Sequence, residues 1–386
     1  MLQRTSYYNL TSEHIGAKQQ NAMKFKTIAK EFQKALGVVE GIIPARTPLP
    51  AATHVLVELK GGTLTLSGSD LNNQVQCSFP AEGEEGVALV PARKLLVFAK
   101  TLQGQELQAE STPDKGLTFT TENIELALPG LPPDDFPRVP SPTGATFKVD
   151  QTTFCRALRM TVFAAAVEDD RHVLRGCYLH FTEGQGRVVA TDSRRLALVQ
   201  FTPTAEPSDP NAQFIIPSAI AKLLLTHLAG ESEVTCTAGE KQVSFECATP
   251  NNGRYRLTFT KLEGNYPNYS RFIQPLQREN TISREALLQA LKRASAAVEE
   301  KEGTVDLQFE GRRLIIKAQT TCKFHEALEM DYKGSPFTTV FAPRYISEAL
   351  EESPDDEVKF DLQGPQAPLV MQGHNFMYLA MPRRIA

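Results

Sequence analysis

Few segments of this chain combine residue types that could catalyse a reaction. Thr191-Asp192-Ser193 places a carboxylate between two hydroxyls, which suits a nucleophilic hydrolase once a base activates the serine. The sequence shows no such base in position, and it contains neither a GxSxG nor a GxxxxGK[ST] segment. A hydrolase that uses Asp192 and Ser193 is therefore only a weak alternative.

The sequence does not indicate metal or cofactor chemistry. His325-Glu326 begins a zinc-protease motif, but Glu329 stands where the second histidine is required. Gly184 and Gly186 precede a strand, which predicts a hairpin turn rather than a dinucleotide loop. No two cysteines form a CxxC pair, so we expect no cofactor, no metal and buried free thiols in a reducing compartment. The cysteines are Cys77, Cys155, Cys177, Cys236, Cys247 and Cys322.

One X-Pro step recurs through the chain at a fixed interval. Val90-Pro91, Ile216-Pro217 and Ala342-Pro343 stand 126 residues apart. Each step opens an apolar stretch whose spacing predicts a helix. These stretches cover residues 92–100, 218–228 and 344–352. Equal spacing over so much of the chain predicts one domain built three times.

Other landmarks repeat in the same order. A strand followed by a helical run begins near Met23, Thr146 and Asn280, and Ser283 followed by Glu285 marks a helix start. We expect α+β domains in which two helices cover an antiparallel sheet. The expected domains are residues 23–144, 145–275 and 276–386, after a disordered N-terminal extension at residues 1–22.

The composition indicates a soluble globular chain, with 41% hydrophobic and 22% charged residues. No apolar run reaches the roughly 20 residues that span a bilayer. The first 22 residues lack the apolar region of a secretory signal. We therefore expect a cytoplasmic protein without a membrane partner.

Positive charge is concentrated on the predicted helices, although the net charge is −4. The six helical segments together carry +8, so the rest of the chain carries −12. Ordinary solvated helix faces explain this pattern in one way. A basic lining that holds a polyanion by phosphate contacts, without reading its sequence, explains it in another. Residues 343–352 are the exception, with a charge of −2.

The size of a helix-lined hole decides how many chains could surround such a polyanion. At about 9 Å between helix axes, six helices enclose a circle roughly 17 Å across and twelve enclose one roughly 34 Å across. Side chains narrow the hole by about 5 Å on each side, and duplex DNA is roughly 20 Å wide. One chain is too small to encircle a duplex, and two chains suffice.

Four segments give the chain its resemblance to a known family. They are VALVPARKLL from Val87, GRVVATDSRRLAL from Gly186, EGNYPNYSRFIQP from Glu263 and YLAMPRR from Tyr378. Together they resemble the bacterial DNA sliding clamp, the beta subunit of DNA polymerase III, from Met23 to about Arg384. The resemblance implies a head-to-tail homodimer that forms a six-domain ring, with helices inside and sheets outside. Such a ring encircles duplex DNA and tethers polymerases without catalysis.

The resemblance also implies a pocket between the second and third domains. In the family this pocket accepts short, partly apolar motifs of the DNA polymerase III alpha subunit, the clamp loader and other clamp-binding proteins. We expect leucines to form an apolar floor, and Arg195, Arg271 and Arg384 to clamp polar or carboxylate groups. The residues carried over are Leu174, Thr191, Ser193, Arg194, Arg195, Leu196, Pro267, Arg271, Phe272, Leu379, Met381, Pro382, Arg383 and Arg384.

Two departures from the family pattern fall in this pocket. The family usually has Gly-His where this chain has Ser193-Arg194, and often Met where it has Arg383. Both changes add positive charge to the rim, so we expect partner motifs with acidic flanks.

Contacts to DNA are expected from a loop and from the helices. Arg46 lies in a loop that matches a DNA-contacting arginine of the family. The helix candidates are Lys30, Lys34, Arg93, Lys100, Arg156, Arg159, Lys292 and Arg293. The sequence leaves open which of them face inward.

A second function class stays open beside the DNA-encircling scaffold. A clamp-like paralogue could bind protein partners as a monomer without encircling DNA. The altered pocket rim and the third repeat, with Gln319-Thr320 in place of the Asp of the other repeats, keep this alternative in view.

Overall fold

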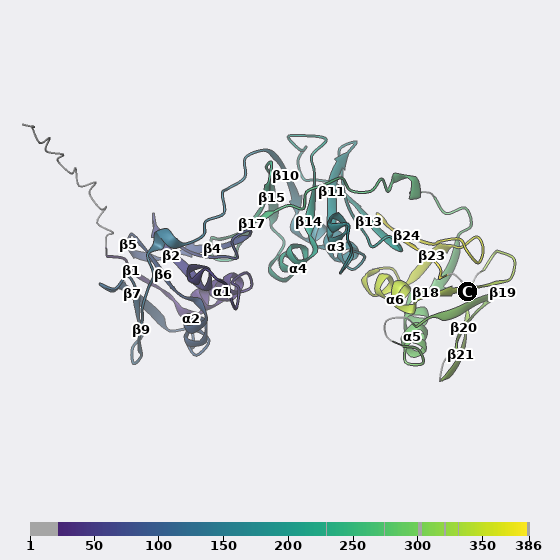
Figure 1. Cartoon of the computed structure of the whole chain (residues 1–386), viewed down its shortest axis with the longest axis horizontal. Coiled ribbons are helices and arrows are strands. Elements are labelled where there is room, and N and C mark those ends of the chain that lie inside the picture. Colours follow the sequence, from purple (N-terminus) through teal and green to yellow (C-terminus); the bar gives the residue numbers. More distant parts are fainter. Residues whose placement is uncertain are drawn as a thin grey trace, which may run out of the picture.

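The computed structural model describes residues 22–228, 230–273, 275–299, 303–319, 322–330 and 332–383. The expected N-terminal extension lies outside this part of the chain, apart from Ala22. The described part of the chain forms an arch, with six α-helices on the inner side and the sheets toward the outside (Figure 1). No helix in the described part is long and apolar enough to cross a membrane.

The same order of elements occurs three times along the chain. Each third has a strand and a helix, a three-stranded run, a strand and a second helix, and a final three-stranded run. The short strand β5 is an addition to the first third. This order confirms the repeat that the X-Pro steps predict.

The first third contains β1 (Lys24–Ile28), α1 (Ala29–Glu40), η1 (Pro50–Thr53), β2 (His54–Lys60), β3 (Thr63–Ser69), β4 (Gln74–Pro80), β5 (Glu82–Glu84), β6 (Gly86–Pro91), α2 (Ala92–Ala99), β7 (Glu106–Ser111), β8 (Leu117–Thr120), β9 (Glu125–Leu128) and η2 (Pro133–Asp135). The second contains β10 (Ala145–Asp150), α3 (Gln151–Val162), η3 (His172–Arg175), β11 (Gly176–Thr182), β12 (Gln185–Thr191), β13 (Arg195–Phe201), β14 (Gln213–Pro217), α4 (Ser218–His227), β15 (Glu233–Ala238), β16 (Gln242–Thr249), β17 (Gly253–Thr260) and η4 (Ser270–Phe272). The third contains β18 (Asn280–Ser283), α5 (Arg284–Ser295), β19 (Val305–Glu310), β20 (Arg313–Gln319), β21 (Lys323–Glu329), β22 (Phe337–Phe341), α6 (Pro343–Glu352), β23 (Glu357–Asp361), β24 (Leu369–Gly373) and β25 (Phe376–Ala380).

Two of the sheets run across the seams between thirds. The first eight-stranded sheet has the order β10-β15-β16-β17-β4-β3-β2-β6, so β17 of the second third pairs with β4 of the first. The other has the order β14-β11-β12-β13-β25-β24-β23-β18 and joins β13 to β25. The ends of the arch carry smaller sheets, β5-β1-β7-β8-β9 and β21-β20-β19-β22. Antiparallel pairing thus holds the three repeats in one continuous arch.

The core lies between the sheets and the inner helices. On α1, Phe32, Leu36 and Val39 are buried at helical spacing, and Phe32 meets Phe119 of β8 at 5.8 Å between ring centroids. The Ser283 hydroxyl accepts a hydrogen bond from the Ala286 N–H at 3.4 Å, which confirms the predicted start of α5.

The structure confirms the strand and the helix predicted near Met23, as β1 and α1. The count of helix charge is wrong at this point, because it includes residues 24–36 with a charge of +3, and Lys24 and Lys26 of that segment lie on β1. These two lysines pair with Glu110 and Glu106 of β7, each at 3.5 Å. Their alternation with the buried Phe25 shows a strand rather than a helix face.

Candidate partner-binding pocket and nucleic-acid interface

The candidate pocket lies at the seam between β13 and β25. Leu196 pairs with Leu379 across this seam, and the Met381 N–H donates to the Arg194 carbonyl at 2.8 Å. Ala197 and Val199 belong to the main core. Because successive side chains of a strand point to opposite faces, Leu196 and Leu198 lie on the other, outer face of the sheet.

Two small apolar clusters form this outer face. One contains Val189, Leu196, Leu198, Tyr269, Met377 and Leu379, and the other contains Ala166, Val173, Leu174 and Ile215. Tyr178 and Tyr266 pack against both clusters, and their rings stack with centroids 4.8 Å apart. Burial raises the pKa of both phenols, so they stay neutral. The three candidate leucines thus lie in an apolar floor that two tyrosines connect.

Exposed apolar side chains stand beside this floor. Phe272 of η4 is 42% exposed and Met381 is 39% exposed, although both are large and hydrophobic. The Arg271 guanidinium lies over the Phe272 ring at 4.8 Å from its centroid, and Pro267 is exposed nearby in the chain. Apolar surface beside cationic groups suits a partly apolar peptide.

The turn after β12 shapes the other side of the candidate pocket. Ser193 has a φ of 76°, a left-handed conformation that glycine adopts more readily. Its N–H donates to the Thr191 hydroxyl at 3.1 Å, and its own hydroxyl accepts from Arg171. Thr191 therefore holds the turn, and Arg171 is a rim residue that the sequence did not single out.

The structure corrects the expected role of Arg195. Its side chain is buried, at 8% exposure, and points to the seam rather than to the outer apolar face. It donates to Asp192 at 3.0 Å, to the Phe163 carbonyl at 2.7 Å and to Glu348. Arg195 is thus already bonded on all sides and does not fit the clamp role expected for it.

The C-terminal segment leaves the seam beside the third domain. The Arg383 N–H donates to the Val340 carbonyl of β22 at 2.7 Å, and Pro382 and Arg383 are half-buried. This segment is therefore docked onto the fold. Arg384 lies outside the described residues.

All nine DNA candidates are exposed. Eight lie on the inner helices or their caps, and Arg46 lies in the loop after α1 (Figure 1). Lys34 pairs with Glu31 at 3.3 Å, and Lys292 pairs with Glu351 at 2.8 Å. Arg293 binds Glu326 of β21 through two nitrogens. Within the described part of the chain, Lys30, Arg46, Arg93, Lys100, Arg156 and Arg159 form no ion pair and present their charge to the solvent.

Two of the three carboxylates on the acidic helix α6 form ion pairs with basic residues of other elements. Glu348 binds Arg195, and Glu351 binds Lys292 of α5. Burial raises the pKa of Glu352, Arg159 of α3 opposes this shift, and Glu351 adds to it. The negative charge of residues 343–352 is thus balanced by Arg195 at the seam and Lys292 of α5, and Arg159 of α3 acts on Glu352 electrostatically.

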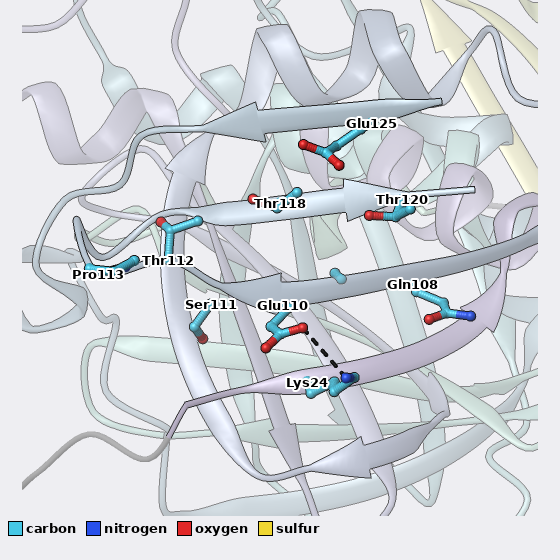
Figure 2. Close-up of a pocket in the computed structure, with 10 residues that line it drawn as sticks. Lys24, Gln108, Glu110, Ser111, Thr112, Pro113, Thr118, Thr120 and Glu125 are labelled. Carbon is cyan, nitrogen blue, oxygen red and sulfur yellow. Dashed lines mark ion pairs between the residues drawn. The ribbon is translucent and has the colours of Figure 1, made fainter. Parts of the chain in front are cut away.

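Another hollow of about 370 Å³ lies on the five-stranded sheet β5-β1-β7-β8-β9, on the face that points away from α1. Figure 2 shows Lys24 on β1, Gln108 and Glu110 on β7, and Glu125 on β9 around it. The Lys24–Glu110 ion pair spans 3.5 Å, and the labelled lining is polar or exposed. It lacks the apolar floor of the seam and is not the candidate pocket.

The groups considered for catalysis serve the fold. Asp192 accepts from the N–H groups of Arg194 and Arg195. Within the described residues, no three His, Cys, Asp or Glu side chains could hold a metal ion. Five cysteines are buried, but Cys322 is exposed, so the expectation that all six are buried is wrong. Its place beside the start of β21, at an open sheet edge, explains the difference.

Comparison with known proteins agrees with this geometry. Models of the N-terminal, central and C-terminal domains of the DNA polymerase III beta subunit match residues 23–140, 148–268 and 274–384. The beta sliding clamp of Pseudomonas putida is 27% identical over 94% of this chain and all of its own length. That of Chlamydia muridarum is 25% identical over 94% of this chain and 99% of its own.

A solved structure extends the likeness to three dimensions. The DnaN sliding clamp of Pseudomonas aeruginosa, bound to griselimycin, matches with a TM-score of 0.88 at 26% identity, over 95% of this chain and all of its own. The fold is that of a three-domain clamp. With all three domain models matched, the chain belongs to the DNA polymerase III beta subunit family.

Proposed function

We propose that this chain is a DNA sliding clamp. Two copies close head to tail into a six-domain ring around duplex DNA, and the ring tethers the replication proteins that dock on its outer face. The domains would be residues 23–144, 145–275 and 276–386. The observation that carries this proposal is the pair of sheet edges left open at the two ends of the arch.

These two edges are equivalent to the edges already paired inside the chain. At each internal seam, the last strand of the first three-stranded run of one repeat pairs with the final strand of the next repeat, as β4 does with β17 and β13 with β25. The strand equivalent to β4 and β13 in the last repeat is β21, and the final strand of the first repeat is β9. Both lie at the edge of their sheets, and an open edge invites pairing with another chain.

The internal seam also supplies the register. At the first seam Val75 pairs with Leu257. Phe324 occupies the place of Val75 in β21, because Ala318 pairs with Phe324 as Gly68 pairs with Val75. Leu126 pairs with Phe119, and Leu257 pairs with Phe245, in equivalent strands. The ring would therefore place Leu126 of one chain opposite the partner's Phe324.

The inner helices would hold DNA by its phosphates. Six exposed basic residues without ion pairs in the described part of the chain lie on or beside these helices. Exposed, separate charges give many weak contacts that do not depend on base sequence. A ring held in this way can move along the duplex, which a processivity factor requires.

The outer pocket at the β13–β25 seam would bind partner motifs. Its buried leucines, exposed Phe272 and Met381, and rim arginines suit a short, partly apolar segment with acidic flanks. We expect the DNA polymerase III alpha subunit, the clamp loader and other clamp-binding proteins as its partners. Griselimycin, the ligand in the Pseudomonas aeruginosa structure, would occupy the same pocket.

A ring of this kind holds its partners on DNA because it encircles the duplex, and this needs no catalysis. We therefore propose that the chain is a non-catalytic subunit of the polymerase. We also propose that it acts in the cytoplasm. The clamp-like paralogue is not favoured. Relatives named beta sliding clamps match over their whole length, and the open edges of the arch have the strands needed to close a ring.

Retention on circular DNA tests this function. The chain is loaded onto nicked circular DNA by the clamp loader of the same bacterium, and the complex is passed through a sizing column in high salt. We expect retention on the circle and loss after one cut that linearises it. Equal loss from both forms would contradict encirclement.

A further inference from the structure

The side chain of Arg195 connects the outer pocket to the inner helices. Its backbone belongs to the pocket, because it precedes Leu196 on β13 and follows Arg194, whose carbonyl accepts from Met381. Its guanidinium lies on the opposite side of the sheet, between α3 and α6. Because its backbone lies at the pocket and its guanidinium lies between α3 and α6, Arg195 can transmit a displacement of α6 to the pocket.

On the side of the second domain, Arg195 is held by two acceptors. Its Nε donates to Asp192 at 3.0 Å, and one terminal nitrogen donates to the Phe163 carbonyl, just after α3, at 2.7 Å. The other oxygen of Asp192 accepts from the backbone N–H groups of Arg194 and Arg195. The same carboxylate therefore fixes both the guanidinium and the turn at the pocket rim.

On the side of the third domain, Arg195 meets helix α6. Its remaining terminal nitrogen donates to Glu348, and the guanidinium lies 5.0 Å from the centroid of the Tyr345 ring. The Tyr345 carbonyl accepts from the Tyr378 hydroxyl of β25. Glu348 is the acidic group of the third domain in this contact, and it does not belong to the outer apolar face.

Removing Glu348 would leave a buried cation whose hydrogen-bond acceptors all lie in the second domain, with the Tyr345 ring as its remaining contact on the third. Breaking one partner from a buried, hydrogen-bonded ion pair is far more disruptive than losing an exposed pair. The side chains of Arg195 and Glu348 are 9% and 36% exposed, whereas those of Lys292 and Glu351 are 48% and 45% exposed. Glu348 and Glu351 therefore make a matched comparison on one helix, α6.

We propose that Arg195 and Glu348 form a latch that positions the two walls of the partner pocket. Arg195 is a positioning residue: it holds β13 against α6, and thereby holds Leu196 opposite Leu379. Glu348, on the DNA side of the seam, then controls the affinity of partners on the outer side. This inference rests on the proposed function, because it concerns the same pocket.

The test compares Glu348→Ala with Glu351→Ala in the full-length protein. Griselimycin is the probe, and its dissociation constant is measured by calorimetry. Hydrogen exchange at the Met381 amide reports the seam directly, because this N–H donates to the Arg194 carbonyl. We expect Glu348→Ala to weaken binding by about fivefold or more and to speed exchange at Met381, and Glu351→Ala to change neither.

Three results would overturn the latch. They are unchanged binding in Glu348→Ala, equal weakening in both variants, and weaker binding without faster exchange at Met381, which would indicate direct contact with the ligand. If Glu348→Ala does not fold, Glu348→Gln replaces it, because it keeps the shape and removes the charge. Failure of the wild-type chain to bind griselimycin would count against the proposed pocket, and the exchange at Met381 would still test the contact across the seam.

Discussion

Asp70 and Asp192 hold the same turn in two successive repeats. Asp70 accepts hydrogen bonds from the N–H groups of Asn72 and Asn73, as Asp192 does from those of Arg194 and Arg195. In both turns the residue after the aspartate has a positive φ, 86° at Leu71 and 76° at Ser193. The repeated aspartate that suggested chemistry is therefore a structural feature of the clamp domain.

This turn predicts a stabilising change at Leu71. A leucine in the left-handed region costs about 1–2 kcal/mol, and this one is also 50% exposed. We expect Leu71→Gly to raise the stability by about 0.5–1 kcal/mol after the entropic cost of glycine. Thermal unfolding measures the gain, with Leu71→Ala as the control that keeps the strain. Equal midpoints for the two variants would contradict this account of the turn.

The basic residues of α3 predict the salt dependence of DNA binding. We expect Arg156→Ala and Arg159→Ala each to weaken binding to a short duplex and to reduce the slope of log affinity against log salt by about 0.9 per lost phosphate contact. Lys148→Ala is the control, because Lys148 alternates with the buried Phe147 and Val149 and faces outward. Fluorescence anisotropy at several salt concentrations gives the slopes. A loss in the Lys148 variant as large as in the α3 variants would place the DNA elsewhere.

Glu352 predicts a pH-dependent gain in stability. Its pKa is raised above the ordinary value of 4.5, mainly by burial, so its carboxylate destabilises the fold when it is ionised. Glu352→Gln should therefore raise the melting temperature at neutral pH. The gain should disappear as the pH falls through the folded pKa toward the unfolded value, where wild-type Glu352 is protonated in both states. Glu351→Gln, which removes the pair with Lys292, should give no gain, and a gain at every pH for Glu352→Gln would refute the explanation.

The cysteines predict a single reactive thiol. Burial raises the pKa of Cys77 and Cys177 to about 12 and that of Cys155 and Cys247 to about 11, and it also raises the pKa of Cys236. Only the thiolate reacts with disulfide reagents, and Cys322 alone is exposed. We expect one fast thiol per native chain, six in denaturant and none that is fast in Cys322→Ser. Two or more fast thiols in the native wild type would show that the core opens readily.

Local patterns were enough to predict the repeated elements. Apolar spacing predicted the helices after Pro91, Pro217 and Pro343, and the structure confirms them in α2, α4 and α6. The strand and the helix near Met23 are confirmed, but the charge count took residues 24–36 as one helix, because β1 joins α1 without a break and alternation over five residues is a weak signal. Local sequence therefore determines most elements but not the point where a strand passes into a helix.

The pocket could be predicted only in outline. Motif likeness brought Leu196 and Leu379 together, and the structure pairs them. The inward role of Arg195 depends on Glu348, 153 residues away, and a sequence pattern contains no information on that distance. Tyr178 and Tyr266 were missed for the same reason, because they meet only after β11 and the segment after β17 fold together.

The molar mass in solution tests the central claim most directly. Light scattering at micromolar concentration and moderate salt should give twice the 42.6 kDa of one chain for the wild type. Leu126→Asp, which places a charge opposite the partner's Phe324 in the proposed register, should give a single chain. A wild-type mass of one chain, or a dimer that Leu126→Asp leaves intact, would contradict ring closure through β9 and β21.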